Sequence, residues 1–80
     1  IMGDGPFLVR WTAHPLTKAE VLGLSRVEVE RALLDRHGAR RRNQGAAGWR
    51  VTAGRLVVVY NRPDRGDPSA ACIVTLWRQR

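Results

Sequence analysis

The chain has 80 residues, 44% hydrophobic and 26% charged, which is enough for one small globular domain and too apolar for a disordered segment. Fourteen basic residues against seven acidic ones give a net charge of +7, and the sequence pI is about 11.5. A single cysteine, Cys72, excludes an internal disulfide and a cysteine-built zinc site. The longest apolar run, Leu56 to Tyr60, is far shorter than the roughly 20 residues of a membrane-spanning helix.

The N-terminal part predicts a loose terminus and one strand. Residues 1–6 contain two glycines and a proline, which is typical of a loose end. Phe7 to Thr12 alternates enough to predict a first strand. We expect Pro15 to end this strand, because proline cannot donate to a sheet ladder.

Two helix starts follow in quick succession. Thr17-Lys18-Ala19-Glu20 and Ser25-Arg26-Val27-Glu28 both match the capping box, in which hydroxyl and carboxylate satisfy unpaired backbone amides. We expect Gly23 to stop a first, very short helix in a left-handed conformation. The second helix should run from about Arg26 to Arg36 and stop at Gly38.

The C-terminal half predicts strands. The segment 40–48, which begins with three arginines, has no periodicity and predicts a basic loop. The last strand should run from Ala71 to Arg78, which is rich in β-branched residues. Between them, 49–52 and 55–60 predict a hairpin around Gly54, followed by a Pro/Gly-rich connection over 61–69. The whole chain, 1–80, is then one α+β domain: an N-terminal strand, two short helices on one sheet face, and a three-stranded antiparallel sheet.

The basic charge indicates a polyanionic partner. A domain with a pI above about 9 has the electrostatic character of a nucleic-acid binder, and an acidic protein is the alternative partner. Three consecutive arginines in the predicted loop suit phosphate contact, and further arginines lie in the hairpin and in the connection after it. The candidate nucleic-acid-binding residues are Arg40, Arg41, Arg42, Arg55, Arg62 and Arg65.

Candidate catalytic residues centre on one histidine. His14 lies where the first strand meets the helices, and histidine is the side chain best suited to proton transfer near neutral pH. His37 lies at a helix C-terminus, where a structural role is expected. Arg50, Tyr60 and Arg78 can face one cleft of an antiparallel sheet, where an arginine can stabilise a charged transition state.

Other side chains have simpler explanations. Thr75 in the last strand fits strand propensity, although its hydroxyl is also a candidate second group beside Tyr60. The three tryptophans are expected to pack in the core or across strands rather than stack on bases. Cys72, in an apolar strand, should be an inert buried thiol.

The sequence offers no metal or cofactor motif. Two histidines without nearby cysteines make no plausible metal shell, and the acidic residues offer no pair for two-metal phosphoryl chemistry. There is no phosphate-binding glycine loop and no H-E-x-x-H segment. Any catalysis is therefore expected to need neither metal nor cofactor.

Several segments in order resemble the RelE/ParE superfamily of small bacterial toxins. These segments are His14, Leu24-Ser25-x-x-Glu28-Val29-x-x-Ala32-Leu33, Trp49-Arg50-Val51, Arg55 to Tyr60, and Ile73 to Trp77. Family members place an arginine pair after the histidine, where this chain has Lys18 and Gly23. The resemblance implies a RelE-like α+β fold and a toxin that cleaves tRNA or mRNA, on or off the ribosome. It also implies neutralisation by an acidic antitoxin or immunity protein.

The same resemblance implies a cytoplasmic site of action. Similar folds also form toxic C-terminal domains of larger secreted proteins, which suits the unusual start at Ile1.

Three functional hypotheses follow. The first is a metal-independent endoribonuclease in which the RNA 2′-hydroxyl attacks phosphorus, with His14 as general acid or base, Arg50 and Arg78 neutralising charge, and Tyr60 or Thr75 assisting. The second is a non-catalytic basic module that binds nucleic acid or an acidic protein. The third, implied by the resemblance, is a toxin that poisons DNA gyrase.

Overall fold

A computed structural model describes residues 8–43, 45, 48–62, 64, 66 and 68–79. Its elements in chain order are β1 (Leu8–Trp11), α1 (Ala13–Val21), α2 (Arg26–Arg36), the 3₁₀ turn η1 (His37–Ala39), β2 (Arg41–Arg42), β3 (Trp49–Ala53), β4 (Leu56–Asn61) and β5 (Ala70–Arg78). The predicted loose terminus, Phe7 and Arg65 lie outside the described residues.

The α+β class is confirmed, but the sheet is larger than predicted. It has five strands in the order β1-β5-β4-β3-β2, and it is mixed, because β1 runs parallel to β5 while the other pairs are antiparallel. The prediction of a three-stranded antiparallel sheet was therefore wrong in detail. The first strand joins the sheet beside β5, and two residues of the predicted basic loop form β2 against β3.

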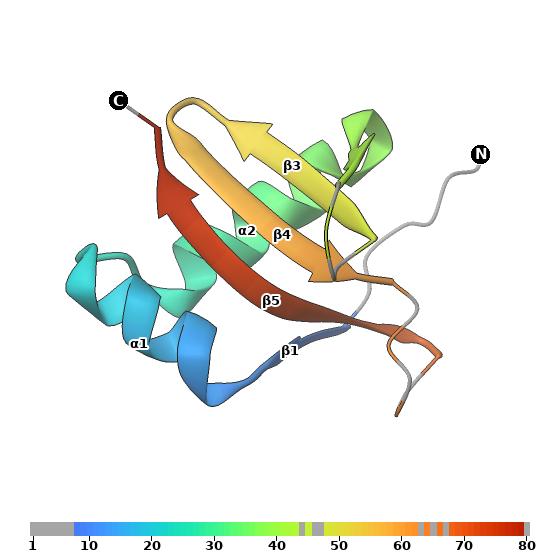
Figure 1. Cartoon of the computed structure of the whole chain (residues 1–80), viewed down its shortest axis with the longest axis horizontal. Helices are drawn as coiled ribbons and strands as arrows, with labels where there is room; N and C mark the ends of the chain where they lie inside the picture. The colour runs from blue at the N-terminus through green and yellow to red at the C-terminus, as the bar shows by residue number, and fades with distance from the viewer. Residues whose placement is uncertain are drawn as a thin grey trace.

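One face of the sheet carries the helices. In Figure 1 the strands cross in front of α2, and α1 lies beside β1 and the lower side of β5. The core on this side is made of buried helix and sheet residues: Ala19, Val29, Leu33, Val51, Val58, Tyr60, Ala71, Ile73 and Leu76. A second, smaller cluster on the opposite face is formed by Val57 and Val59 with Val74 and Trp77 packed against them. We call this opposite side the open face.

The helix boundaries correct one of the two predicted capping boxes. Ser25 accepts from the amide of Glu28 and Glu28 accepts from the amide of Ser25, both at 3.1 Å, so the second box is confirmed. Thr17 instead lies inside α1, which already begins at Ala13. Pro15 is accommodated because the first turn of a helix needs no intrahelical amide donor.

The predicted glycine turns at Gly23 and Gly54 are confirmed. Gly23 and Gly54 have φ of 71° and 61°, the left-handed conformation that favours glycine after a helix and in a tight hairpin. Gly38 lies within η1 and does not adopt this conformation. α2 runs from Arg26 to Arg36, as predicted, and the chain then continues through Gly38 in the 3₁₀ turn.

A β-bulge in β5 decides which side chains reach the open face. Val59 pairs with Thr75 while the next residue, Tyr60, pairs with Ile73, so Val74 is an extra residue. Ile73 and Leu76 are therefore both in the helix-side core, although strict alternation would send them to opposite faces. The same shift brings Thr75 onto the face that carries Val59.

Candidate functional site

The open face carries one row of residues that crosses the sheet. Residues paired across strands share a face, and the register joins Arg41 to Arg50, Arg50 to Val59, and Val59 to Thr75. His14, in the first turn of α1, ends the row: its Nε2 lies 3.2 Å from the Oγ1 of Thr75. Two basic side chains and the exposed histidine thus lie on one face, although they come from three separate elements, β2, β3 and α1.

Thr75 and His14 form a contact that orients the imidazole. Because Nε2 faces the threonine hydroxyl, Nδ1 remains directed away from this contact. In the tautomer in which Nε2–H donates to Thr75, Nδ1 carries the lone pair and acts as a base. Lys18 follows His14 by one helical turn, so it lies on the same side of α1.

Arg41 and Arg50 are a pair of like charges placed directly opposite each other. Such pairs destabilise a sheet unless an anion lies between them. No described carboxylate lies within ion-pair distance of either arginine; the described ion pair is Arg10 with Asp64, at 3.0 Å. The arrangement therefore favours the binding of an anionic group such as a phosphate.

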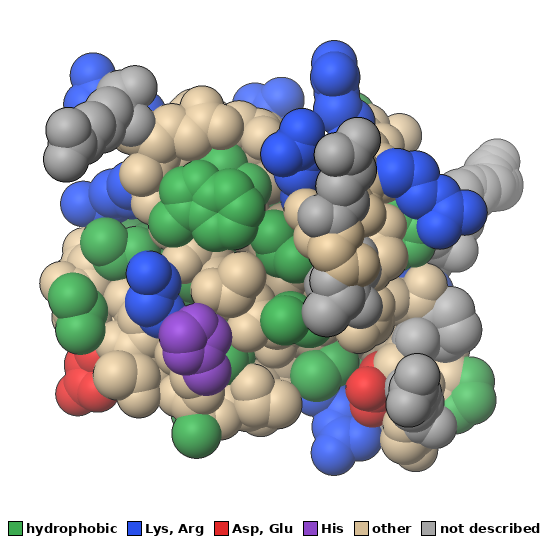
Figure 2. Space-filling model, viewed as in Figure 1, with side chains coloured by type: hydrophobic (Ala, Val, Ile, Leu, Met, Phe, Trp, Pro, Cys, Tyr) green, Lys and Arg blue, Asp and Glu red, His purple; other side chains and the backbone are tan. Residues whose placement is uncertain are grey.

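The centre of the open face is apolar. Figure 2 shows hydrophobic side chains over the middle of this face, with basic side chains around them and a histidine at one side. Val57 pairs with Trp77 on β5, next to the row that holds Thr75. The face thus combines an apolar floor with cationic margins.

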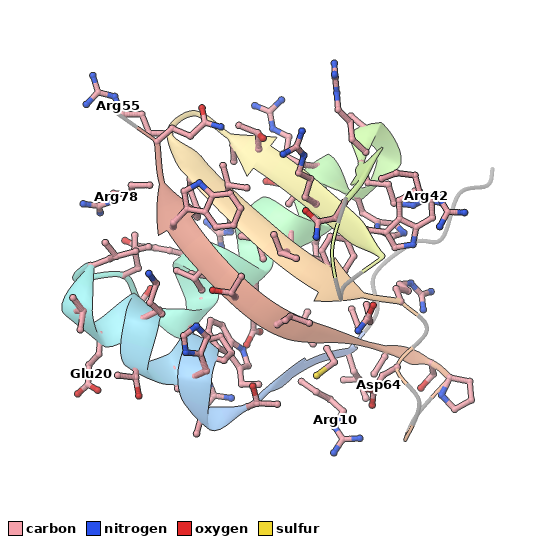
Figure 3. The ribbon with its side chains drawn as sticks, viewed as in Figure 1. Arg10, Glu20, Arg42, Arg55, Asp64 and Arg78 are labelled. Carbon is pink, nitrogen blue, oxygen red and sulfur yellow. The ribbon has the colours of Figure 1, made fainter. Side chains whose placement is uncertain are left out.

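Two predicted catalytic residues do not belong to this site. Tyr60 was predicted to face a cleft with Arg50, but its side chain is fully buried on the helix side and its hydroxyl lies 2.6 Å from Nδ1 of His37. Arg78 pairs with Leu56, which packs on the helix-side core, and Figure 3 shows its side chain at the margin of the sheet. The expected cleft shared by Arg50, Tyr60 and Arg78 was therefore wrong.

The remaining predicted basic residues spread around the molecule. Arg40 and Arg42 lie over the Trp49 ring, at 4.4 and 4.5 Å from its centroid, so their charges are partly engaged by cation–π contacts. Figure 3 shows Arg55 at a corner of the sheet, pointing outward. Arg62 is half-buried.

Arg10 and Cys72, which also lie on the open face, take part in structural contacts. Arg10 pairs with Cys72 across strands and reaches Asp64, as Figure 3 shows. Burial raises the pKa of the Cys72 thiol, the Asp64 carboxylate raises it further, and Arg10 opposes the rise. Cys72 is therefore a poor nucleophile, as expected, although it is only partly buried.

The other features of the structure offer less support for a catalytic or binding site. Among the residues that the structure describes, no three His, Cys, Asp or Glu side chains are grouped to hold a metal ion. A hollow of about 340 Å³ is lined by residues of α2, among them Val27, Arg31 and Asp35, and by Ala53 at the end of β3. Within the described part of the chain, no helix is both long and apolar enough to cross a membrane.

No protein-family model, curated protein or solved structure matches this chain.

Proposed function

We propose that the protein is a metal-independent endoribonuclease, a toxin that acts on RNA in the cytoplasm and is neutralised by an acidic antitoxin or immunity protein. The observation that carries the proposal is the row of Arg50, Val59, Thr75 and His14 on the open face. Arg50 supplies a cation and His14 a base on the same face of the sheet, with Val59 and Thr75 between them.

The proposed reaction is attack of the RNA 2′-hydroxyl on the adjacent phosphorus. Nδ1 of His14 takes the proton of this hydroxyl, with the imidazole held by Thr75. The oxygen–phosphorus bond that forms gives a 2′,3′-cyclic phosphate, and the 5′-oxygen leaves and takes a proton from water. Arg50 neutralises the charge on the phosphorane, and Arg41 holds a neighbouring phosphate.

Distances across the sheet support these roles. Arg50 and Thr75 lie two strands apart, so their backbones are about 10 Å apart, with Val59 between them. A phosphate bound between Arg50 and Thr75 thus has a guanidinium on one side and His14 on the other.

The test is cleavage of total RNA and a defined tRNA in EDTA. His14→Ala should lower the rate about 10²- to 10⁴-fold, the usual contribution of a general acid–base group, and leave the fold unchanged. The wild-type products should end in cyclic phosphates. Wild-type rates in a folded His14→Ala variant would remove His14 from the mechanism.

A second candidate function is a non-catalytic basic module that binds RNA or an acidic protein through the same face. The observation that favours it is the opposed pair Arg41 and Arg50, which attracts an anion and requires no catalysis. Intact RNA in the cleavage test, together with RNA binding by the folded protein, would favour this second function.

A further inference from the structure

Trp77 differs from the other two tryptophans in what lies against its ring. Nε1 of Trp11 donates to Glu30 at 2.7 Å, and Arg26 lies over its ring. Trp49 lies between two arginines. Among the described residues, neither a cation nor a hydrogen-bond partner is found for Trp77, which is half-buried and lies on the open face against Val57.

The surroundings of Trp77 are complementary to a nucleotide chain. In Figures 1 and 2, α2 lies behind the sheet and α1 lies beside β5, so no described element packs over this floor. Cations border it: Arg41 and Arg50 come from the far strands, and Lys18 follows His14 on α1. An apolar partner without charge would leave these cations unused, whereas a nucleotide supplies both a flat apolar base and a phosphate.

The position of Trp77 fits one nucleotide beside the reacting phosphate. Thr75 and Trp77 are two residues apart on β5 and face the same side, so they are separated by about 7 Å along the strand. A strand whose phosphate lies between Arg50 and His14 therefore places an adjacent base over Trp77.

We propose that Trp77 is the platform on which one unpaired base of a single-stranded RNA stacks, a binding role that rests on the proposed function for its position. Aromatic side chains on an exposed sheet face recognise unpaired bases in this way, because every base has a π-face. Base-paired RNA keeps its bases stacked on each other and does not offer one to Trp77. The protein is thereby selective for unpaired RNA.

The test uses a labelled single-stranded RNA in which every 2′-hydroxyl is methylated, so that it binds but cannot react. The dissociation constant is measured by fluorescence anisotropy for wild type, Trp77→Leu and Trp77→Phe. Loss of one stacked base should weaken binding by Trp77→Leu about 5- to 150-fold, and Trp77→Phe should stay close to wild type. Val21→Ala, an exposed apolar residue of α1, is the matched control and should not change binding.

Intrinsic fluorescence gives a second readout that does not depend on affinity. A stacked base quenches indole emission, so the single-stranded RNA should quench the wild type at saturation, and Trp77→Phe should remove most of the quenching. Duplex RNA of the same sequence should produce no quenching that depends on Trp77. Circular dichroism and thermal unfolding show that each variant is folded.

The outcomes separate this proposal from the proposed reaction. The stacking role would be overturned if folded Trp77→Leu bound the RNA as tightly as wild type. It would also be overturned if wild type did not bind single-stranded RNA, and a protein partner would then be the occupant of this face. Dependence of binding on Trp77 in a protein that leaves natural RNA intact would support stacking and overturn only the cleavage reaction.

Discussion

The hydrogen bond between Tyr60 and His37 connects the sheet to the turn that leads into the basic strand β2. Both side chains are buried, and the backbone oxygen of His37 also accepts from Nη1 of Arg40 at 3.1 Å. The pair therefore supports the segment that carries Arg41, although neither side chain reaches the open face. Its role is structural, which matches the role expected for His37 and differs from the one expected for Tyr60.

Tyr60→Phe tests this structural role. The substitution keeps the ring but removes the hydroxyl from a buried hydrogen bond, so we expect the free energy of unfolding to fall by about 1–3 kcal/mol. Urea unfolding followed by circular dichroism measures the change. Cleavage by the folded variant should remain at the wild-type rate, and a large loss of cleavage without loss of stability would return Tyr60 to the catalytic site.

At the scale of elements, the two similar capping sequences have different roles. Ser25 caps α2 through a complete capping box, whereas Thr17 lies in the middle of α1. Ser25→Ala should therefore lower the free energy of unfolding by about 1 kcal/mol, the usual cost of removing an N-cap. Thr17→Ala should be neutral or slightly stabilising, because alanine has the higher helix propensity. Equal losses in thermal unfolding of both variants would contradict the observed start of α1.

The sequence predicted these elements well where the signal is local. The capping box at Ser25, the left-handed Gly23 and the β-branched run of β4 each depend on a few neighbouring residues, and all three were predicted. The start of α1 was not, because Pro15 is compatible with both a strand end and a first helical turn. The parallel pairing of β1 with β5 joins distant segments, and no local pattern encodes it.

The candidate site was only partly predictable for the same reason. His14, Arg50 and Thr75 were chosen by residue type, and their meeting on one face depends on the bulge at Val74. A bulge changes the facing of every later residue in a strand, and the sequence carries no clear mark of it. Tyr60 follows Val59, the partner of Arg50, so alternation along β4 places it on the other face, and this register could not be read from the sequence. Trp77 packs across strands against Val57, as predicted.

At the scale of the whole molecule, the charge of +7 does not by itself say where an RNA lies. Arg41, Arg50 and Lys18 border the open face, while Arg55 points outward from a corner of the sheet (Figure 3). If RNA binds the open face through these three cations, the logarithm of its association constant should fall with the logarithm of salt concentration with a slope of about −2. Binding spread over the whole basic surface would give a much steeper slope.

Variants that remove one positive charge show which arginines contribute to this salt dependence. Arg50→Gln should reduce the steepness of the slope by about 0.7, because one phosphate contact of a single strand is lost. Arg55→Gln removes the same charge from the molecule and should leave the slope unchanged, since net charge alone acts weakly beyond a Debye length of about 8 Å at physiological salt. Anisotropy titrations of the methylated single-stranded RNA at several salt concentrations give both slopes. Equal changes in the two variants would show that the basic surface attracts RNA without a defined site, and the open face would lose its place as the binding surface.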